Sequence, residues 1–262
     1  MADVGLFDLL DDGVGFGAKT LKTLKITVTK PREYFLAAQT PDWSGFSPSI
    51  RVYVVLLAVS SYLRYLYLGD GQLMTELYVG QFEMVIEQLS DEDPRWLQAD
   101  PREMANQTLA ELFFWTPFIS FVLYTLFGMV WMAYAEKLSL AVRVRYIYAL
   151  LIPATMFMLV STVAMVTLPS QWAAYLSFSG LFGSAIVVSI TAYFGAYPET
   201  ESSGGKLMRA ITLGFALIGV MMLGTLLALA WGSVQAVATA MSAFPPIETT
   251  VTPETVPAVE MP

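Results

Sequence analysis

Five long apolar stretches constrain this chain more than any other feature of its sequence. A helix that crosses the hydrocarbon core of a bilayer needs about 20 mostly apolar residues, and each stretch comes close to that length or exceeds it. They cover residues 50–68, 112–135, 146–168, 172–197 and 207–231. The sequence therefore predicts an all-α, polytopic membrane protein with five transmembrane helices.

The composition supports a membrane-embedded chain. Charged residues make up 14% of the 262 positions and hydrophobic residues 56%, with a mean hydropathy of +0.58. A soluble domain carries about 25% charged residues, so a soluble enzyme with a surface active site is excluded. Nucleic acid is not an expected partner, because the net charge is −8 and phosphate contacts need basic patches.

Lysine and arginine predict the orientation of the spans, because positive residues stay on the cytoplasmic side. Eleven of the fourteen lie in the N-terminal segment, at the start of the first stretch, in the loops that follow the second and fourth stretches, or at the start of the fifth stretch. The opposite loops carry only Arg95 and Arg102, while Arg64 lies within the first stretch. We expect the N-terminus inside and the C-terminus outside.

This topology divides the chain into three parts. Residues 1–48 form a cytoplasmic segment, residues 49–232 the membrane domain, and residues 233–262 an external tail that we expect to be disordered. The membrane domain includes an external loop, residues 69–111, with ten acidic residues against two arginines. The acids lack the spacing of a calcium-binding loop, so we interpret the loop as a solvated acidic face that is partly helical.

A basic amphipathic helix is predicted between Phe16 and Val28. Its apolar side comprises Leu21, Leu24 and Val28, and its basic side Lys19, Lys22 and Lys25. This pattern is typical of a helix lying on an anionic lipid surface. Packing of the same helix on its own bundle is the alternative.

Two missing residue types narrow the chemistry. The chain has no cysteine and no histidine, which excludes thiolate nucleophiles, Cys- and His-based metal sites and His general bases. We expect no cofactor, no metal and no catalytic residue. A membrane enzyme that uses Glu76, Glu83 or Glu87 is the weakest of three functional hypotheses.

Three kinds of residue within the stretches suggest specific roles. Arg64 is interpreted as an interfacial membrane anchor or as a partner in an ion pair with an acid of the outer loop. Pro117 and Pro153 predict helix kinks. Small residues favour close packing between helices of the chain or contact with a partner helix. They are Ser179, Gly180, Gly183, Ser184 and Gly214.

Three segments share features with one membrane-protein family. Residues 23–35, TLKITVTKPREYF, combine a basic helix with a Pro-Arg-Glu-Tyr-Phe box, and residues 144–153, VRYIYALLIP, place tyrosines before a proline. Residues 193–216 join a polar loop to a Gly/Ala-rich last span. These features resemble the Yip-domain family of five-span membrane proteins and its bacterial relatives. The resemblance implies a non-enzymatic membrane organiser; the long acidic loop departs from the short hairpin of eukaryotic members, so small-GTPase binding is not carried over.

The sequence thus favours a non-enzymatic scaffold or accessory subunit of the inner membrane that associates with lipids, with other integral membrane proteins or with itself. A small permease, channel or lipid-handling transporter acting as an oligomer is the alternative.

Overall fold

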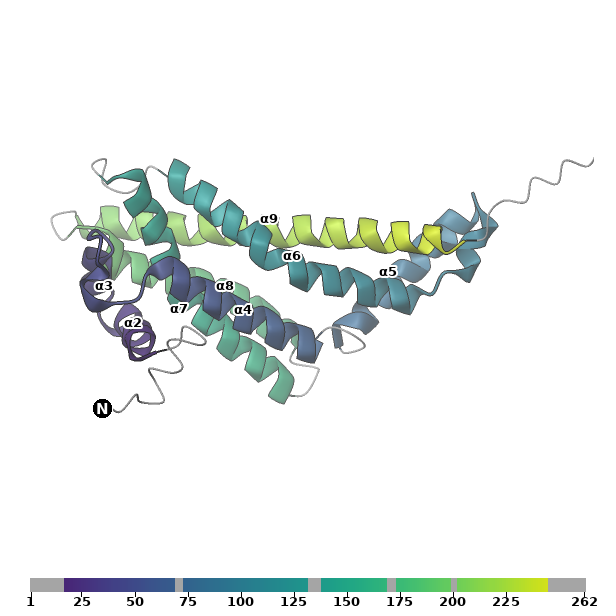
Figure 1. Cartoon of the computed structure of the whole chain (residues 1–262), viewed down its shortest axis with the longest axis horizontal. Coiled ribbons are helices and arrows are strands. Elements are labelled where there is room, and N and C mark those ends of the chain that lie inside the picture. The colour runs from purple at the N-terminus through teal and green to yellow at the C-terminus, as the bar shows by residue number, and fades with distance from the viewer. Residues whose placement is uncertain (1–16, 69–72, 132–137, 169–172, 199–201, 245–262) are drawn as a thin grey trace, which may run out of the picture.

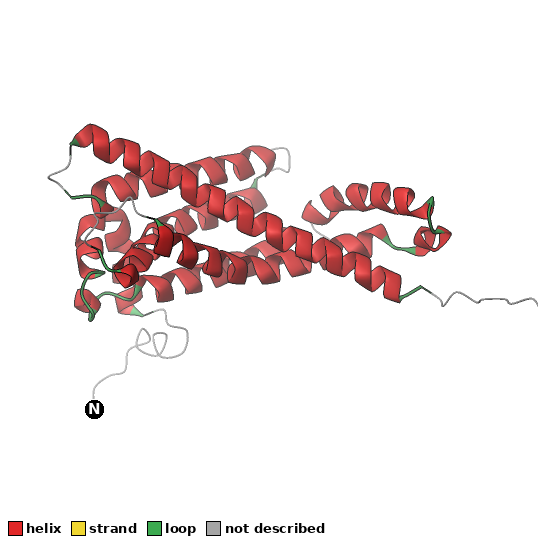
Figure 2. Ribbon diagram, turned by 90° about the horizontal axis from the view of Figure 1, so that it is seen from above, coloured by secondary structure: helices red, strands yellow, loops and turns green. Residues whose placement is uncertain are grey.

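The computed structural model describes residues 17–68, 73–131, 138–168, 173–198 and 202–244, and the regular structure in these ranges is entirely helical (Figures 1 and 2). The helices are α2 (Ala18–Thr29), α3 (Pro31–Ala37), α4 (Ser49–Leu68), α5 (Leu73–Ser90), α6 (Pro101–Val130), α7 (Leu140–Thr167), α8 (Ala173–Thr191) and α9 (Ser203–Ser242). Two 3-10 turns, η1 (Trp43–Gly45) and η2 (Pro94–Gln98), and a π-helical turn, η4 (Ala192–Ala196), complete the described elements. The predicted all-α class is confirmed.

Within the described ranges, four helical segments are long and apolar enough to cross a membrane, as expected for a multi-pass membrane protein. They are Pro101–Val130, Leu140–Met165, Ser179–Ala196 and Ser203–Ser242. The first expected stretch forms α4, which is not among these four.

The long helices form two layers. Helices α6 and α9 run antiparallel along the length of the molecule, and α4, α7 and α8 form the second layer (Figure 1). The layers meet at the end where α2 and α3 pack and separate towards the other end of α4 and α7. The side chains between the two layers therefore determine whether a ligand can bind between them.

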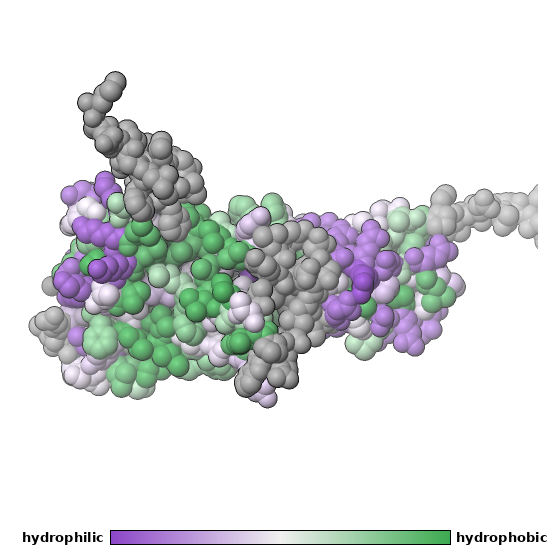
Figure 3. Space-filling model, turned by 90° about the horizontal axis from the view of Figure 1, so that it is seen from below, coloured by the Kyte–Doolittle hydropathy of each residue, from purple (hydrophilic) through white to green (hydrophobic). Residues whose placement is uncertain are grey.

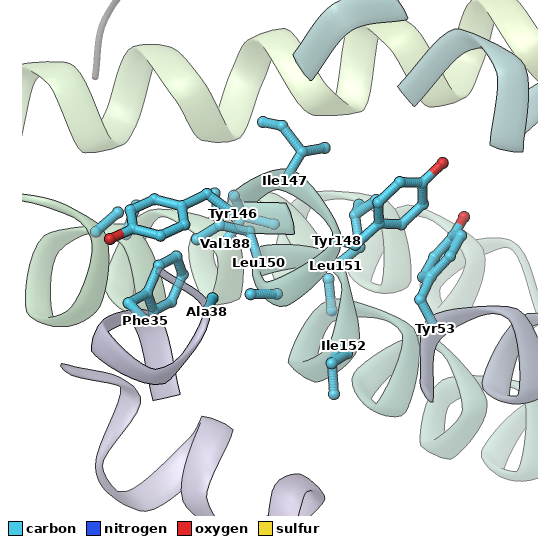
Figure 4. Packing of buried hydrophobic residues seen from close by; sticks show 14 of the residues in the cluster. Phe35, Ala38, Tyr53, Tyr146, Ile147, Tyr148, Leu150, Leu151, Ile152 and Val188 are labelled. Atoms are coloured by element: carbon cyan, nitrogen blue, oxygen red, sulfur yellow. The ribbon is translucent and has the colours of Figure 1, made fainter. Parts of the chain in front are cut away.

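The main core surrounds the first half of α7, where every residue from Tyr146 to Ile152 is buried. Aromatic side chains from neighbouring elements pack against it (Figure 4). The Phe35 ring lies 4.7 Å from that of Tyr146, and the Tyr53 ring 5.1 Å from that of Tyr148. The tyrosines of the segment 144–153 thus fix the joint between the two layers and α3.

A second, smaller core lies at the far end of α6 and α9. We call this part the headpiece (residues 73–107 and 232–244); its centre contains Phe82, Ile86, Trp96 and Ala236. In the space-filling view this end is largely hydrophilic, whereas the bundle presents a broad apolar surface (Figure 3). The change in surface marks where the apolar bundle ends.

The structure corrects two predicted boundaries. The second apolar stretch, expected from residue 112, belongs to a longer helix, because α6 begins at Pro101, after the N-cap Asp100, and continues to Val130. Residues 233–242, expected to be disordered, are the last turns of α9, because Ala236 is buried against the headpiece. Residues 245–262 lie outside the described part of the chain.

Candidate functional site

A cavity lies between the two helix layers. Its main part has a volume of about 390 Å³, and a narrower extension of about 100 Å³ shares six lining residues with it. Helices α4, α6, α7, α8 and α9 all contribute to the lining, together with Tyr78 of α5. We call the two parts together the central cavity. Its size falls within the range of small-molecule binding sites.

Hydroxyl groups and one guanidinium line the main part of the central cavity, beside apolar side chains. The polar lining comprises Ser60, Ser61, Arg64, Thr116, Ser161, Thr162 and Thr225, as well as Tyr78. The apolar lining includes Leu57, Leu112, Phe113, Met158, Leu176 and Leu181. A site with both kinds of surface suits a molecule that has a polar and an apolar part.

Arg64 is the one charged residue among the described residues that line the cavity. Its Nε donates a hydrogen bond to the Thr162 hydroxyl at 3.4 Å. Within the described ranges no carboxylate pairs with it and no other hydrogen bond uses its guanidinium. The structure therefore places Arg64 inside the bundle, and the ion pair considered for it is not found among the described acids.

Most hydroxyls of the cavity are already engaged as donors. Those of Thr116, Ser161 and Thr225 donate to carbonyl oxygens of their own helices at 2.6, 3.1 and 3.1 Å. Ser60 and Ser61 make no hydrogen bond in the described structure, although Ser60 is buried. Ser60 lies four residues before Arg64, so both occupy the same face of α4. The spacing was visible in the sequence, but the cavity that gives it meaning was not.

The predicted small-residue group is used largely inside the chain. A Cβ at Gly183 would clash with the Phe157 ring of α7, and one at Gly214 would lie 2.7 Å from the carbonyl oxygen of Ala185 in α8. Gly180 and Ser184 line the central cavity, whereas Ser179 is exposed. Gly183 and Gly214 therefore serve contacts between the chain's own helices.

A longer small-residue stripe was missed in the sequence. Gly224, Ala228, Gly232 and Ala236 recur every four residues along α9 and are all buried. A Cβ at Gly232 would lie 2.7 Å from the carbonyl oxygen of Thr108 in α6. The four-residue period was the available signal, and it explains why α6 and α9 stay together over their length.

The proposed lipid-surface helix exists, but with a different buried face. Helix α2 buries Thr20, Thr23 and Thr27 against the bundle, because these hydroxyls find partners there or in their own helix. Leu21 and Val28, two of the three residues on the expected apolar side, are 44% and 58% exposed. The three lysines Lys19, Lys22 and Lys25 are exposed as well. Apolar and basic side chains are thus both available on the outer surface of α2.

Two other basic residues fasten the N-terminal helices to the bundle. Arg32 of α3 donates to the carbonyl oxygens of Gly195 and Tyr197, both at 3.2 Å. Arg145 of α7 donates to the carbonyl oxygens of Ala38 and Thr40, both at 3.1 Å. These contacts give the segments that carry the family resemblance a structural role in this chain.

The predicted kink positions lie inside continuous helices. Helix α6 continues through Pro117 and α7 through Pro153. Thr155, two residues after Pro153, donates its hydroxyl proton to the carbonyl oxygen of Leu151 at 2.8 Å. Bending at the two prolines stays a prediction.

The carboxylates of the weakest hypothesis do not form an evident catalytic group. Glu76 forms an ion pair with Arg102, and Glu83 and Glu87 are exposed along α5. Among the described residues, no three potential metal-ligating side chains lie close together. The central cavity is therefore the best-defined candidate site.

Comparison with known proteins assigns the chain to no family. No family model, no curated protein and no solved structure matches the chain.

Proposed function

We propose that this chain is a non-enzymatic, multi-pass membrane protein that binds a lipid or a similar amphiphile in its central cavity. In this proposal α4, α6, α7, α8 and α9 are the five spans, with the N-terminus in the cytoplasm and the headpiece outside. The inner membrane is the proposed location.

The observation that carries the proposal is the mixed lining of the central cavity. Leucine, phenylalanine and methionine side chains share the cavity with seven polar residues from four helices and with Tyr78 of a fifth. An amphiphile satisfies both surfaces, whereas a purely apolar or a purely polar ligand would leave one of them without a partner. Of the functions considered from the sequence, lipid handling fits this site best.

One observation favours a scaffold as a second candidate. The headpiece projects beyond the apolar bundle as a packed unit with its own core. Of this unit only Tyr78 is among the described residues that line the central cavity, so lipid binding there does not account for the rest of it. A scaffold or accessory subunit would use it to contact other membrane proteins, as the resemblance to the Yip-domain family suggests.

Filling the cavity tests the first proposal. Thr225 lies on α9, lines the cavity and is exposed to it. We expect Thr225→Trp to displace a bound lipid and to lower the fraction of protein that retains it at least tenfold, measured by native mass spectrometry from mild detergent after titration with a diacyl lipid.

Thr212→Trp is the matched control. Thr212 lies on the same helix, is exposed, and donates to its own backbone as Thr225 does, but it does not line the cavity. Lipid retention should be unchanged in this variant. Equal retention in wild type and both variants, or no retention in any, would overturn the proposal.

A further inference from the structure

We infer that Ser60 and Arg64 form a headgroup subsite for an anionic amphiphile, a molecule with a phosphate or carboxylate head on an apolar chain. This inference rests on the proposed function and names the ligand class. The juxtaposition that carries it is a guanidinium and a buried hydroxyl on one face of α4, both turned into the central cavity.

The charge of the cavity determines the sign of the ligand. Arg64 brings a positive charge into a cavity between apolar helices, and no described lining residue is acidic. A charge in such a place is costly unless it is paired. Because Thr162 supplies only a neutral oxygen, an anion is the ligand that completes the site.

The hydrogen-bond donors of the subsite match an oxyanion. A guanidinium has five N–H donors in a planar fork, and one of them is used by a described residue, at the long distance of 3.4 Å. The remaining N–H groups can bind two oxygens of a phosphate or carboxylate at once. The Ser60 hydroxyl adds a further donor that no described residue uses.

The rest of the lining shows that the anion is attached to an apolar chain. Leu57, Leu112, Leu176 and Leu181 border the same space as Arg64. A free phosphate would leave this surface uncovered, whereas an acyl chain covers it and gains about 0.8 kcal/mol for each buried methylene group. The ligand is therefore a lipid-like anion from the bilayer and not a soluble ion.

The test compares three ligands on the full-length protein in mild detergent. Phosphatidylglycerol offers the anion and the chains, diacylglycerol the chains alone, and glycerol phosphate the anion alone. For the wild type we expect phosphatidylglycerol to bind at least tenfold more tightly than either of the others, measured by native mass spectrometry and isothermal titration calorimetry.

Variants then assign the effect to Arg64. We expect Arg64→Gln to weaken phosphatidylglycerol binding at least tenfold, the scale of one lost charge-assisted hydrogen bond, and to weaken diacylglycerol binding much less. Arg64→Lys should restore part of the loss. Arg51→Gln removes a positive charge from the same helix outside the cavity and should have no effect.

The outcomes separate this inference from the proposed function. Equal binding of phosphatidylglycerol and diacylglycerol, or an unchanged Arg64→Gln variant, would overturn the anionic subsite while lipid binding stands. Glycerol phosphate that binds as tightly as phosphatidylglycerol would overturn the lipid source. If no lipid binds and Thr225→Trp has no effect, the proposed function itself fails. The ligand comparison on the wild type decides the question even if an Arg64 variant does not fold.

Discussion

Three arginines, Arg32, Arg64 and Arg145, have hydrogen-bond partners that are distant in sequence, and these partners determine the role of each arginine. Insertion scales put the cost of an arginine at the centre of a membrane helix at about 2.5–3.5 kcal/mol. In the proposed topology Arg64 would bear part of this cost, because it lies four residues before the end of α4 and has one neutral partner among the described residues. By contrast, Arg32 and Arg145 each donate to two backbone carbonyl oxygens and so fix the N-terminal helices.

Asp93 gives the headpiece a predicted dependence on pH. Its carboxylate accepts hydrogen bonds from the Arg95 side chain and backbone, which lowers the pKa of Asp93 below its usual value of 3.8. Folding therefore favours the ionised form. The contribution is fully present above the unfolded pKa and is lost as the pH falls through the lower folded pKa. We expect the amide protection of η2, next to buried Trp96, to decrease below about pH 4.

Hydrogen exchange of the peptide around η2, corrected for the intrinsic rate at each pH, measures this step. Asp93→Asn should already show reduced protection at pH 7 and a smaller step on acidification. Glu92→Gln changes the neighbouring exposed carboxyl group and is the control. Protection that stays constant from pH 6 to pH 2.5 in the wild type would contradict the prediction.

At the scale of elements, small residues set how closely the helices approach. Gly183 faces α7, Gly214 faces α8, and the stripe that ends at Ala236 faces α6. These contacts limit the use of Gly183→Leu as a test for a partner helix. Gly183→Leu would disturb the contact with Phe157 inside the chain, so its effect on a partner complex could not be separated from an effect on the fold.

Gly214 and Gly219 form a matched pair on α9. A Cβ at Gly214 meets the Ala185 carbonyl at 2.7 Å, whereas one at Gly219 has nothing within 4 Å. Overpacking typically costs about 1–3 kcal/mol, so Gly214→Ala should lower the thermal midpoint in detergent. Gly219→Ala should leave it unchanged or raise it, because alanine favours a helix over glycine by up to about 1 kcal/mol. If both variants melt alike, the α8–α9 contact does not limit stability.

At the scale of the whole molecule, the length of α9 places the headpiece at a distance from the apolar bundle. Helix α9 has 40 residues, about 60 Å, which is twice the thickness of a hydrocarbon core. The surplus length of α9, together with the first turns of α6, carries the headpiece beyond the apolar bundle. The antiparallel pair thus links the headpiece to the layer that borders the central cavity.

The absence of cysteine makes the topology directly testable. Single cysteines replacing exposed Lys25, Glu92 and Ser203 report on α2, the headpiece and the start of α9. With five spans, a membrane-impermeant maleimide should label Glu92→Cys in intact cells, and Lys25→Cys and Ser203→Cys only after permeabilisation. Labelling of Lys25→Cys and Glu92→Cys from the same side would show that α4 does not cross the membrane.

The sequence by itself determined the helical class, the apolar segments and the polar loops between them. These follow from local properties, namely the length of apolar runs and the cost of burying an unpaired backbone group in lipid. It also located Gly183 and Gly214 as packing positions, because the spacing of small residues is a property of one helix. The start of α6 and the end of α9 each lie eleven residues outside the predicted apolar stretches, since an apolar run ends where polar residues begin, while a helix continues wherever a partner packs against it.

Only the tertiary structure decided which helix faces meet. The threonine face of α2 is buried because Ser47, far away in sequence, offers a partner to Thr20. Ser60, Arg64, Thr116, Thr162 and Thr225 come from four separate helices, and they share one cavity because the two layers separate towards one end. Such a convergence depends on distances between elements, and the pattern within any single helix does not encode them.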